Sequence, residues 1–203
     1  MRVYKYHDLF THTESQKGYP FNIIFKLKKD IEQSDLYGPG IYLISFKNKV
    51  VYLGKYRPSN AGNVHSQRWI HHVATLTGRG DKVGFGSANR WLYRFKEIFD
   101  EQGIKINDLS QRKKDTGTVT SLNRIKFSFE NFHSFKDELE MSTFQFHYYR
   151  NDSIQTKKLD QIETYLIKAI NPPANHQYDE GLKVLSLKNA LQLIELRITR
   201  NTN

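Results

Sequence analysis

The sequence predicts an α+β fold, in which a small antiparallel β-sheet is flanked by helices and carries helical, basic insertions. Residues 41–53 contain two β-branched and aromatic runs separated by a short polar turn, a pattern typical of an antiparallel hairpin. Apolar side chains recur at helical spacing in several later segments. A chain of 203 residues is long enough to bury a core as one compact domain with additions.

The first part of the chain gives the weakest structural signals. We expect residues 1–37 to form an N-terminal arm or extension. An apolar patch between Phe21 and Leu27 fits a strand or a short helix equally well, because periodicity cannot decide over so few residues. Gly38-Pro39-Gly40 then interrupts any regular structure.

The hairpin is the clearest local element. Its first strand is expected over Ile41–Phe46 and its second over Val50–Leu53, with a polar turn at Lys47–Lys49 between them. Gly54 is expected to end the second strand, and residues 55–65 to form a polar loop.

A helix is expected over Ser66–Thr77, with its apolar residues on one face. Arg68 and His72 are four residues apart at one border of that face, so both side chains can project from the edge of the core into a cleft. A second helix is expected over Ser87–Gln102 and a strand over Thr143–Arg150, while residues 104–142 are ambiguous.

The strongest helical pattern spans Thr156–Ile170 and is ended by Asn171-Pro172-Pro173. Glu163 falls inside its apolar arc, which is formed by Leu159, Ile162, Tyr165, Leu166, Ala169 and Ile170. A buried carboxylate costs several kcal/mol unless it is paired or binds a metal. Two interpretations remain open here: an ion pair with an arginine, Arg68 included, or a ligand for a hard cation.

The charge balance indicates the class of partner. With 31 Lys and Arg against 21 Asp and Glu, the chain carries a formal charge of +10, which favours nucleic acid or an anionic membrane surface. No apolar run approaches the length of a spanning helix and no secretory signal begins the chain, so we expect no membrane partner and a cytoplasmic location. The absence of cysteine excludes disulfides and thiolate zinc sites.

The two hairpin strands carry a pair of tripeptides, Gly40-Ile41-Tyr42 and Tyr52-Leu53-Gly54. They are followed in order by five further polar residues, namely Lys55, Arg68, His72, Glu163 and Asn175. This series resembles the GIY-YIG nuclease superfamily, and most of all its restriction-type (type II) endonucleases, with Leu53 in place of the usual isoleucine. The resemblance implies a nuclease core over 38–178 with an insertion at about 78–142. In the remaining part, 179–203, the apolar spacing predicts a C-terminal helix over Ser186–Arg197.

The resemblance also implies a reaction: hydrolysis of a DNA phosphodiester with one divalent cation per active site, Mg²⁺ first and Mn²⁺ second. Glu163 would hold the metal. Tyr42 would lie beside the attacking water, as base or as orienting partner. Tyr52 would hydrogen-bond near the scissile phosphate, and Arg68 would clamp that phosphate. Gly40 and Gly54 belong to the structural motif.

The physical chemistry agrees with these roles. A guanidinium suits phosphate because its donors form a planar, bidentate fork. A tyrosine is a poor base at its reference pKa of about 10 and needs a helper. Lys55 and His72 are both candidates, and the sequence does not decide which receives the proton. Asn175 resembles an asparagine that completes the site in some members, and a turn residue after the prolines is the alternative.

Residues 55–126 hold fourteen Lys and Arg against six Asp and Glu, most of the excess positive charge of the chain. Phosphate neutralisation by such residues binds DNA without specifying its sequence. The candidate DNA contacts, besides Asn175, are Arg57, Arg79, Arg90, Arg94, Lys113 and Lys114. For Arg90 and Arg94 a solvated helix face is an equally good interpretation.

We expect a sequence-specific enzyme that cuts both strands of DNA. A homing or phage-type nuclease, a structure-specific repair nuclease and a non-catalytic DNA-binding relative are the alternatives. The chain is close to nuclease-core size and shows no appended zinc finger or helix-turn-helix, which favours the restriction type. Two cuts need two active sites or sequential nicking, so a homodimer is plausible.

Overall fold

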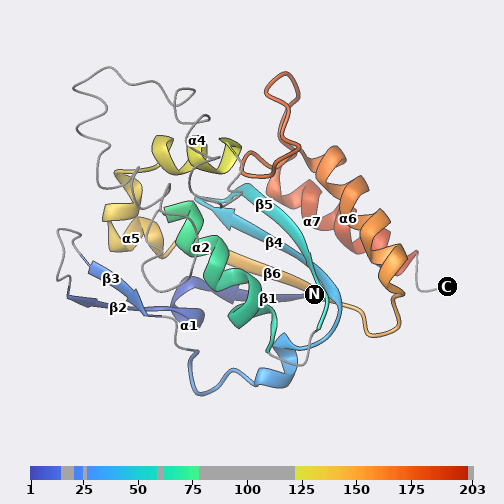
Figure 1. Ribbon diagram of the computed structural model, residues 1–203, viewed down its shortest axis with the longest axis horizontal. Helices are drawn as coiled ribbons and strands as arrows, with labels where there is room; N and C mark the ends of the chain where they lie inside the picture. Colours follow the sequence, from blue (N-terminus) through green and yellow to red (C-terminus); the bar gives the residue numbers. More distant parts are fainter. Residues whose placement is uncertain (15–20, 25–26, 59–61, 78–121, 201–203) are drawn as a thin grey trace, which may run out of the picture.

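The structure is a computed structural model that describes residues 1–14, 21–24, 27–58, 62–77 and 122–200. Its four central strands are β1 (Arg2–Lys5), β4 (Gly40–Phe46), β5 (Lys49–Tyr56) and β6 (Gln145–Arg150). They form one antiparallel sheet in the order β1-β6-β4-β5, with helices packed on it (Figure 1). The α+β class expected from the sequence is therefore confirmed.

The β4–β5 hairpin is confirmed, with one difference at its end. Lys47 and Asn48 form a two-residue turn and have φ angles of 50° and 58°, as a type I′ turn requires. The second strand does not stop at Gly54 as expected. It continues to Tyr56, because Gly54 pairs with Tyr42 and the two residues beyond it also find partners on β4.

A β-bulge in the hairpin decides which way Tyr52 faces. Ile44 pairs with Tyr52, whereas the next residue, Ser45, pairs with Val50, so Val51 is the extra residue of β5. Val51 and Tyr52 consequently pack on the same side of the sheet, although they are neighbours in the strand. This is also the side on which Tyr42 packs.

The two faces of the sheet bury two different cores. Along β4, Ile41 and Leu43 contribute to one cluster and Tyr42 and Ile44 to the other, as the alternation of a strand requires. The first cluster includes α6 (Thr156–Ile170) and α7 (Leu187–Thr199). The second includes the π-helical turn η2 (His65–Trp69) with α2 (Ile70–Thr77), and α4 (Leu122–Glu130). Figure 1 shows α6 and α7 in orange to red, away from α2 and α4 in green and yellow.

The sequence predicted the α6–α7 layer well. The bounds of α6 match the expectation, and α7 begins after Ser186, whose side chain accepts the N–H of Asn189 and caps the helix. Two members of the expected apolar arc are wrong, because Tyr165 is 42% exposed and Ala169 is exposed as well. Glu163 is half-buried at the border of the arc, not enclosed in it.

The helices on the other face were predicted in part. The expected helix at 66–77 is present, but its first turn is π-helical. The ambiguous region 104–142 is described from residue 122 and contains α4, a 3₁₀ turn at Ser134–Lys136 and α5 (Glu138–Met141). The helix expected over 87–102 lies outside the described residues.

The N-terminal segment is more than an extension. β1 pairs with β6 at the edge of the central sheet, and α1 (Tyr6–Leu9) buries Tyr6 and Leu9 in the core. The segment also forms a separate two-stranded sheet and a 3₁₀ turn: β2 (Thr11–Glu14), β3 (Phe21–Ile24) and η1 (Gln33–Leu36). Across the residues that the structure describes, no helix has both the length and the apolarity to cross a bilayer.

Candidate active site

A buried tyrosine–histidine pair lies between the sheet and α2. The hydroxyl of Tyr42 on β4 and Nε2 of His72 on α2 are 2.7 Å apart. The two residues are 2% and 8% exposed, so this hydrogen bond is shielded from water. The two candidate site residues are therefore in direct contact, although thirty positions separate them in the chain.

Tyr52 completes an aromatic cluster with this pair. Its ring centroid lies 4.2 Å from that of His72 and 6.2 Å from that of Tyr42. The β-bulge at Val51 turns Tyr52 toward this side of the sheet. The two motif tyrosines, on the adjacent strands β4 and β5, thus lie next to each other and both contact His72 of α2.

The motif glycines permit close approach of their neighbours. A Cβ on Gly54 would lie 2.5 Å from Oη and 2.7 Å from Cζ of Tyr42. A Cβ on Gly40 would lie 2.4 Å from the carbonyl oxygen of Tyr149. Both distances are far below a normal contact, so a larger residue would force the strands or the Tyr42 ring to move. Gly54 therefore supports the position of the Tyr42 hydroxyl directly.

Burial controls the protonation states of this cluster. It raises the pKa of Tyr42 well above its ordinary value, and it raises the pKa of Tyr52 as well. Burial, helped by nearby arginines, lowers the pKa of His72 well below its ordinary value. Near neutral pH the pair therefore consists of a protonated phenol and a neutral imidazole that can accept a proton.

Arg68 lies at the exposed border of the cluster. Arg68 belongs to the π-helical turn η2 and precedes His72 by four residues, on the helical segment that the sequence predicted. After burial and Arg124, its positive charge is a further cause of the lowered pKa of His72, and it also acts on the pKa of Tyr42. Its guanidinium is therefore within electrostatic range of the Tyr42–His72 pair and accessible to a ligand.

Glu163 lies on α6 at the free edge of β5, within electrostatic range of Tyr42 and Tyr52. Its Oε1 accepts the backbone N–H of Lys55 at 3.1 Å, and its Oε2 accepts the Lys55 ammonium. The same ammonium lies 2.8 Å from Oδ1 of Asp160, one turn earlier on α6. Glu163 thus pairs with Lys55, so the ion pair with an arginine such as Arg68, one of the two interpretations of the sequence, is wrong in its partner.

The charge of Glu163 is felt by both motif tyrosines. Burial is the largest cause of the raised pKa of Tyr42 and of Tyr52, and the Glu163 carboxylate is a smaller cause that also raises both. For Lys55, burial would lower the pKa, but the hydrogen bonds to Asp160 and Glu163 outweigh burial and raise it. Lys55 therefore stays positively charged near neutral pH, whereas His72, beside Tyr42, is neutral.

Asn175 has a role that the sequence did not indicate. Its Oδ1 accepts the N–H of Leu53 at 2.9 Å and its Nδ2 donates to the carbonyl of Leu53 at 2.8 Å. The residue is 3% exposed, and Ala174 beside it donates its N–H to the carbonyl of Val51. Asn175 and Glu163 together occupy the outer edge of β5, which would otherwise leave polar groups unpaired. We therefore assign the Asn175 side chain to the support of this strand and not to a DNA contact.

The candidate DNA contacts have separate outcomes. Arg57 pairs with Asp160 at the same edge of the sheet and is partly exposed. The other five candidates, Arg79, Arg90, Arg94, Lys113 and Lys114, lie outside the described residues.

Sequence analysis missed two residues at this site. Asp160 is three residues before Glu163, so helical spacing alone could have indicated that both carboxylates share one border of α6. Arg124 on α4 lies over the ring of Tyr52, with its Cζ 4.9 Å from the ring centroid. It comes from the ambiguous region, where no motif or periodicity marked it.

The oxygen donors of the site are few. Within residues 1–14, 21–24, 27–58, 62–77 and 122–200, no group of three or more His, Cys, Asp or Glu side chains is gathered closely enough to hold a metal ion. Glu163 and Asp160 are the carboxylates that converge on one cationic group, the Lys55 ammonium. A site of this kind could hold a hard cation through one or two carboxylates and a ligand phosphate.

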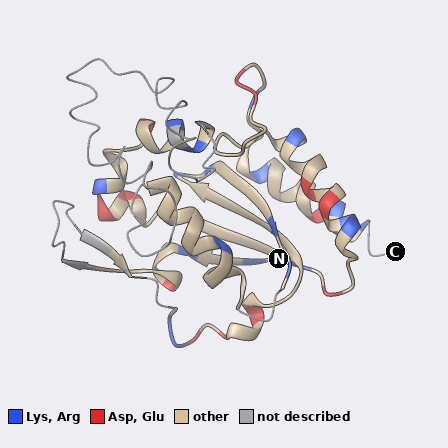
Figure 2. Ribbon diagram, in the orientation of Figure 1, with Lys and Arg blue, Asp and Glu red and all other residues tan. Residues whose placement is uncertain are grey.

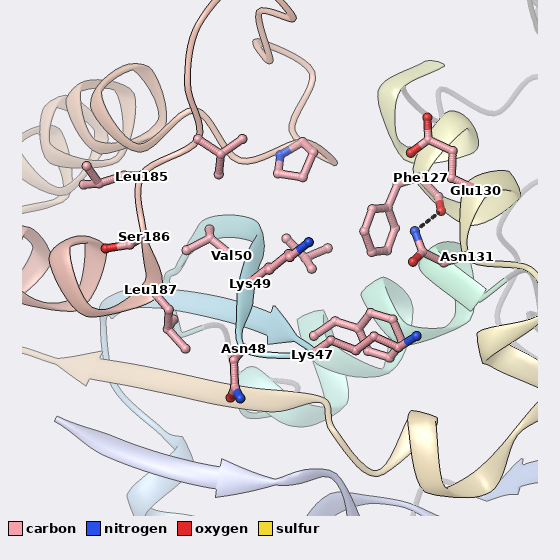
Figure 3. Close-up of a pocket in the computed structure, with 14 residues that line it drawn as sticks. Lys47, Asn48, Lys49, Val50, Phe127, Glu130, Asn131, Leu185, Ser186 and Leu187 are labelled. Carbon is pink, nitrogen blue, oxygen red and sulfur yellow. Dashed lines mark hydrogen bonds between the residues drawn. The ribbon is translucent and has the colours of Figure 1, made fainter.

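A pocket of about 600 Å³ lies elsewhere, at the turn end of the β4–β5 hairpin (Figure 3). The hairpin turn, α4 and the segment leading into α7 form its walls, with Phe127 and Leu187 among the apolar side chains. None of the candidate site residues in the described part of the chain lines it. We therefore do not assign the site to this pocket.

Comparison with known proteins gives no match: no family model, no curated protein and no solved structure matches this chain. What the chain does has to be argued from the arrangement of its own residues.

Proposed function

We propose that this protein is a metal-dependent endonuclease that hydrolyses phosphodiester bonds of double-stranded DNA. One observation carries the proposal: Tyr42, Tyr52 and His72 are in contact, and the charges of Arg68 and Glu163 act on this cluster from η2 and α6. These are the residues that resemble the GIY-YIG series in order. Their convergence is what a shared reaction requires.

The Tyr42–His72 pair supplies the path for the proton of the attacking water. Tyr42 remains a phenol near neutral pH because burial raises its pKa, so it cannot act as a preformed phenolate. It can take the proton of a water molecule only while it passes its own proton to Nε2 of His72, 2.7 Å away. His72 is neutral and can accept that proton. We therefore assign the proton acceptor to His72 and not to Lys55, which is already a cation in an ion pair.

The phosphate side of the reaction falls to Arg68 and Tyr52. In-line attack concentrates negative charge on the non-bridging oxygens, and a guanidinium neutralises that charge with two parallel hydrogen bonds. Arg68 is exposed next to the pair and suits this role. Tyr52, kept protonated by burial, can donate its O–H to a phosphate oxygen.

The carboxylates fit a single divalent cation. Glu163 would hold it and Asp160 would offer a second oxygen, because the fold already directs both toward one cationic group, the Lys55 ammonium. When bound, a hard cation such as Mg²⁺ supplies charge neutralisation at the phosphate and at the leaving oxygen. Lys55 would then be released to contact phosphate as a point charge.

The overall charge supports a polyanionic substrate. The chain carries +10, and most of the excess lies in residues 55–126, which include Arg68 and Arg124. Figure 2 shows basic residues on α4, which ends at the acidic Glu130, and a mixture of basic and acidic residues on α6. We infer that DNA approaches from the side of α2 and α4, where phosphate neutralisation would make affinity strongly dependent on salt.

The test is incubation of the protein with supercoiled plasmid DNA and MgCl₂, with EDTA as the metal-free arm. The wild-type protein is expected to cut the plasmid and Glu163→Gln to leave it intact while still retarding DNA in a gel. Asp152→Asn is the matched control, because it removes an exposed carboxylate paired with Arg150 on the far side of β4. A wild-type protein that binds the plasmid but does not cut it would overturn the proposal in favour of a non-catalytic relative.

The products also show which kind of nuclease this is. Discrete fragments indicate the sequence-specific, double-strand cleavage that we favour. A smear, or a preference for branched DNA, indicates a structure-specific repair enzyme. The homodimer stays a prediction, which sedimentation of the protein with and without a cleavable duplex would test.

A further inference from the structure

Arg124 is a second arginine at the site and comes from a helix that the family resemblance does not cover. Its guanidinium lies over the ring of Tyr52, with Cζ 4.9 Å from the centroid, and its Nη1 is 3.4 Å from Oγ1 of Thr75 on α2. Stacking of this kind uses the flat face of a guanidinium, whereas the N–H groups at its edge are the ones that bind phosphate.

The fold holds α4 against the site through a short series of hydrogen bonds. Asn123, which precedes Arg124, donates its side-chain amide to the carbonyl oxygens of Asn175 and His176 at 3.0 and 3.2 Å. Asn175 in turn holds both backbone groups of Leu53 on β5. The strand that carries Tyr52 and the helix that carries Arg124 are thus fixed to each other.

The apolar side of α4 packs on the core and fixes the position of the helix. Phe127 is buried in the same core as Tyr42, and its carbonyl accepts the side-chain amide of Asn131 at 2.9 Å (Figure 3). With its apolar face packed and its start tied to β5, α4 presents Arg124 at a defined place.

Arg124 acts on the same groups as Arg68. After burial, its charge is the largest influence on the pKa of Tyr52 and of His72, and it lowers both. The two arginines therefore approach one cluster from different helices, η2–α2 and α4. A phosphodiester at this point would be in reach of both charges.

We propose that Arg124 is a second phosphate-binding residue, which contacts from the α4 side the phosphodiester that Arg68 holds from the α2 side. The inference rests on the proposed function, because it assumes that the anion bound here is a phosphodiester. Arg124 would stabilise the same developing charge as Arg68 while its guanidinium keeps the ring of Tyr52 in place.

The first test is single-turnover cleavage of a short duplex with Mg²⁺ by Arg124→Gln, Arg124→Lys and the control Lys126→Gln. Lys126 is on the same helix, and its ammonium pairs with Glu180 at 2.8 Å, so its removal changes charge without touching the site. We expect a loss of about 100-fold for Arg124→Gln and about 10-fold for Arg124→Lys, which keeps charge but not the planar fork. Rates for Arg124→Gln within about threefold of Lys126→Gln would overturn the inference.

The second test does not depend on cleavage. Inorganic phosphate is titrated into the wild type and the same variants, and binding is followed by the NMR signals of the His72 ring. We expect the dissociation constant to rise about tenfold in Arg124→Gln, a loss of one charge-assisted contact, and to be unchanged in Lys126→Gln. Equal phosphate affinity in these two variants would overturn the inference even if the protein cuts DNA.

The two tests separate the two proposals. If the wild type cuts no DNA but phosphate binding depends on Arg124, the nuclease function fails and the anion site stands. Should Arg124→Gln not fold, judged by its thermal unfolding, the comparison of Arg124→Lys with the wild type decides in its place.

Discussion

The two faces of the central sheet bury different types of side chain. The face toward α6 and α7 buries mostly aliphatic side chains, such as Ile41, Leu43 and Leu166, each 0% exposed. The face toward α2 and α4 buries aromatic rings, with Tyr42 and Trp69 among them. Nδ1 of His72 and Nε1 of Trp69 are buried on this second face without a partner among the described residues, as is Nδ1 of His147 on the first face.

The difference indicates where stability and chemistry reside. An aliphatic face gains free energy from burial alone, at roughly 25 cal/mol per Å² of apolar surface. An aromatic face with buried hydroxyl and imidazole groups sacrifices part of that gain, since a polar group left unsatisfied costs about 1–3 kcal/mol. Such a cost is typical of functional sites. We therefore infer that the α6–α7 face is mainly a scaffold and that the α2–α4 face carries the proposed site.

The largest effect is expected from removal of the exposed arginine on the second face. Arg68→Ala should lower the cleavage rate by about 100- to 1000-fold, because it removes a charged donor that acts on the phosphate in the transition state. The control is Arg197→Ala on the scaffold side, where the guanidinium lies over the ring of Tyr165 at 3.8 Å. Single-turnover cleavage is the measurement, and similar rates for the two variants would remove the distinction between the faces.

A smaller effect is expected from a change that only displaces Tyr42. In Gly54→Ala the new methyl group would lie 2.5 Å from the Tyr42 hydroxyl, so the ring or its strand must shift and the contact between Tyr42 and His72 is disturbed. We expect a loss of about 100-fold in rate, as a misplacement of about 1 Å can cause. Gly181→Ala is the matched control, since its nearest neighbour is Oδ1 of Asp179 at 3.2 Å. Normal cleavage by Gly54→Ala would show that the place of Tyr42 is unimportant.

Much of the fold could be predicted because its signals are local. The hairpin follows from two β-branched runs around a turn, and α6 from an uninterrupted helical period ended by prolines. β1 could not be predicted, because its four residues become a strand only through pairing with β6, more than 140 residues away. The same holds for the bulge at Val51, for which Val50-Val51-Tyr52 carries no sequence marker.

The site was predictable to the extent that spacing along one element places residues together. Arg68 and His72 follow from their spacing of four on a helix. The partner of Glu163 did not follow, because its pairing with Lys55 in place of an arginine depends on how α6 crosses the edge of β5. Arg124 could not be found, since only the packing of α4 on α2 brings it to Tyr52.

The smallest effect concerns pH, which acts on both faces through buried histidines. Burial lowers the pKa of His65 and of His147 to about 4. In the unfolded chain these histidines have the ordinary pKa of about 6.5 and take up protons as the pH falls below it, whereas in the folded chain they stay neutral. The free energy of unfolding therefore decreases as pH decreases from 7 to 5. Each buried histidine should cost roughly 1–2 kcal/mol of unfolding free energy over that range.

A change at His147 should affect stability without affecting cleavage, because this residue lies on the scaffold side, with its Nε2 3.3 Å from Oγ of Ser45. Urea unfolding of His147→Asn should show a pH-dependent loss smaller by roughly 1–2 kcal/mol than that of the wild type. Its cleavage rate should keep the wild-type pH profile, which His72 sets. An altered rate profile with unchanged stability would reverse the roles assigned to the two faces.

Neighbouring residues of β4 allow the most direct test, because Tyr42 and Leu43 point to opposite faces of the sheet. Urea unfolding and single-turnover cleavage with Mg²⁺ are measured for Tyr42→Phe and Leu43→Ala. Tyr42→Phe should lose about 1 kcal/mol of stability and at least about 100-fold in rate. Leu43→Ala should lose about 2–5 kcal/mol of stability, with a normal rate for each folded molecule. Cleavage by Tyr42→Phe at the wild-type rate would contradict the account.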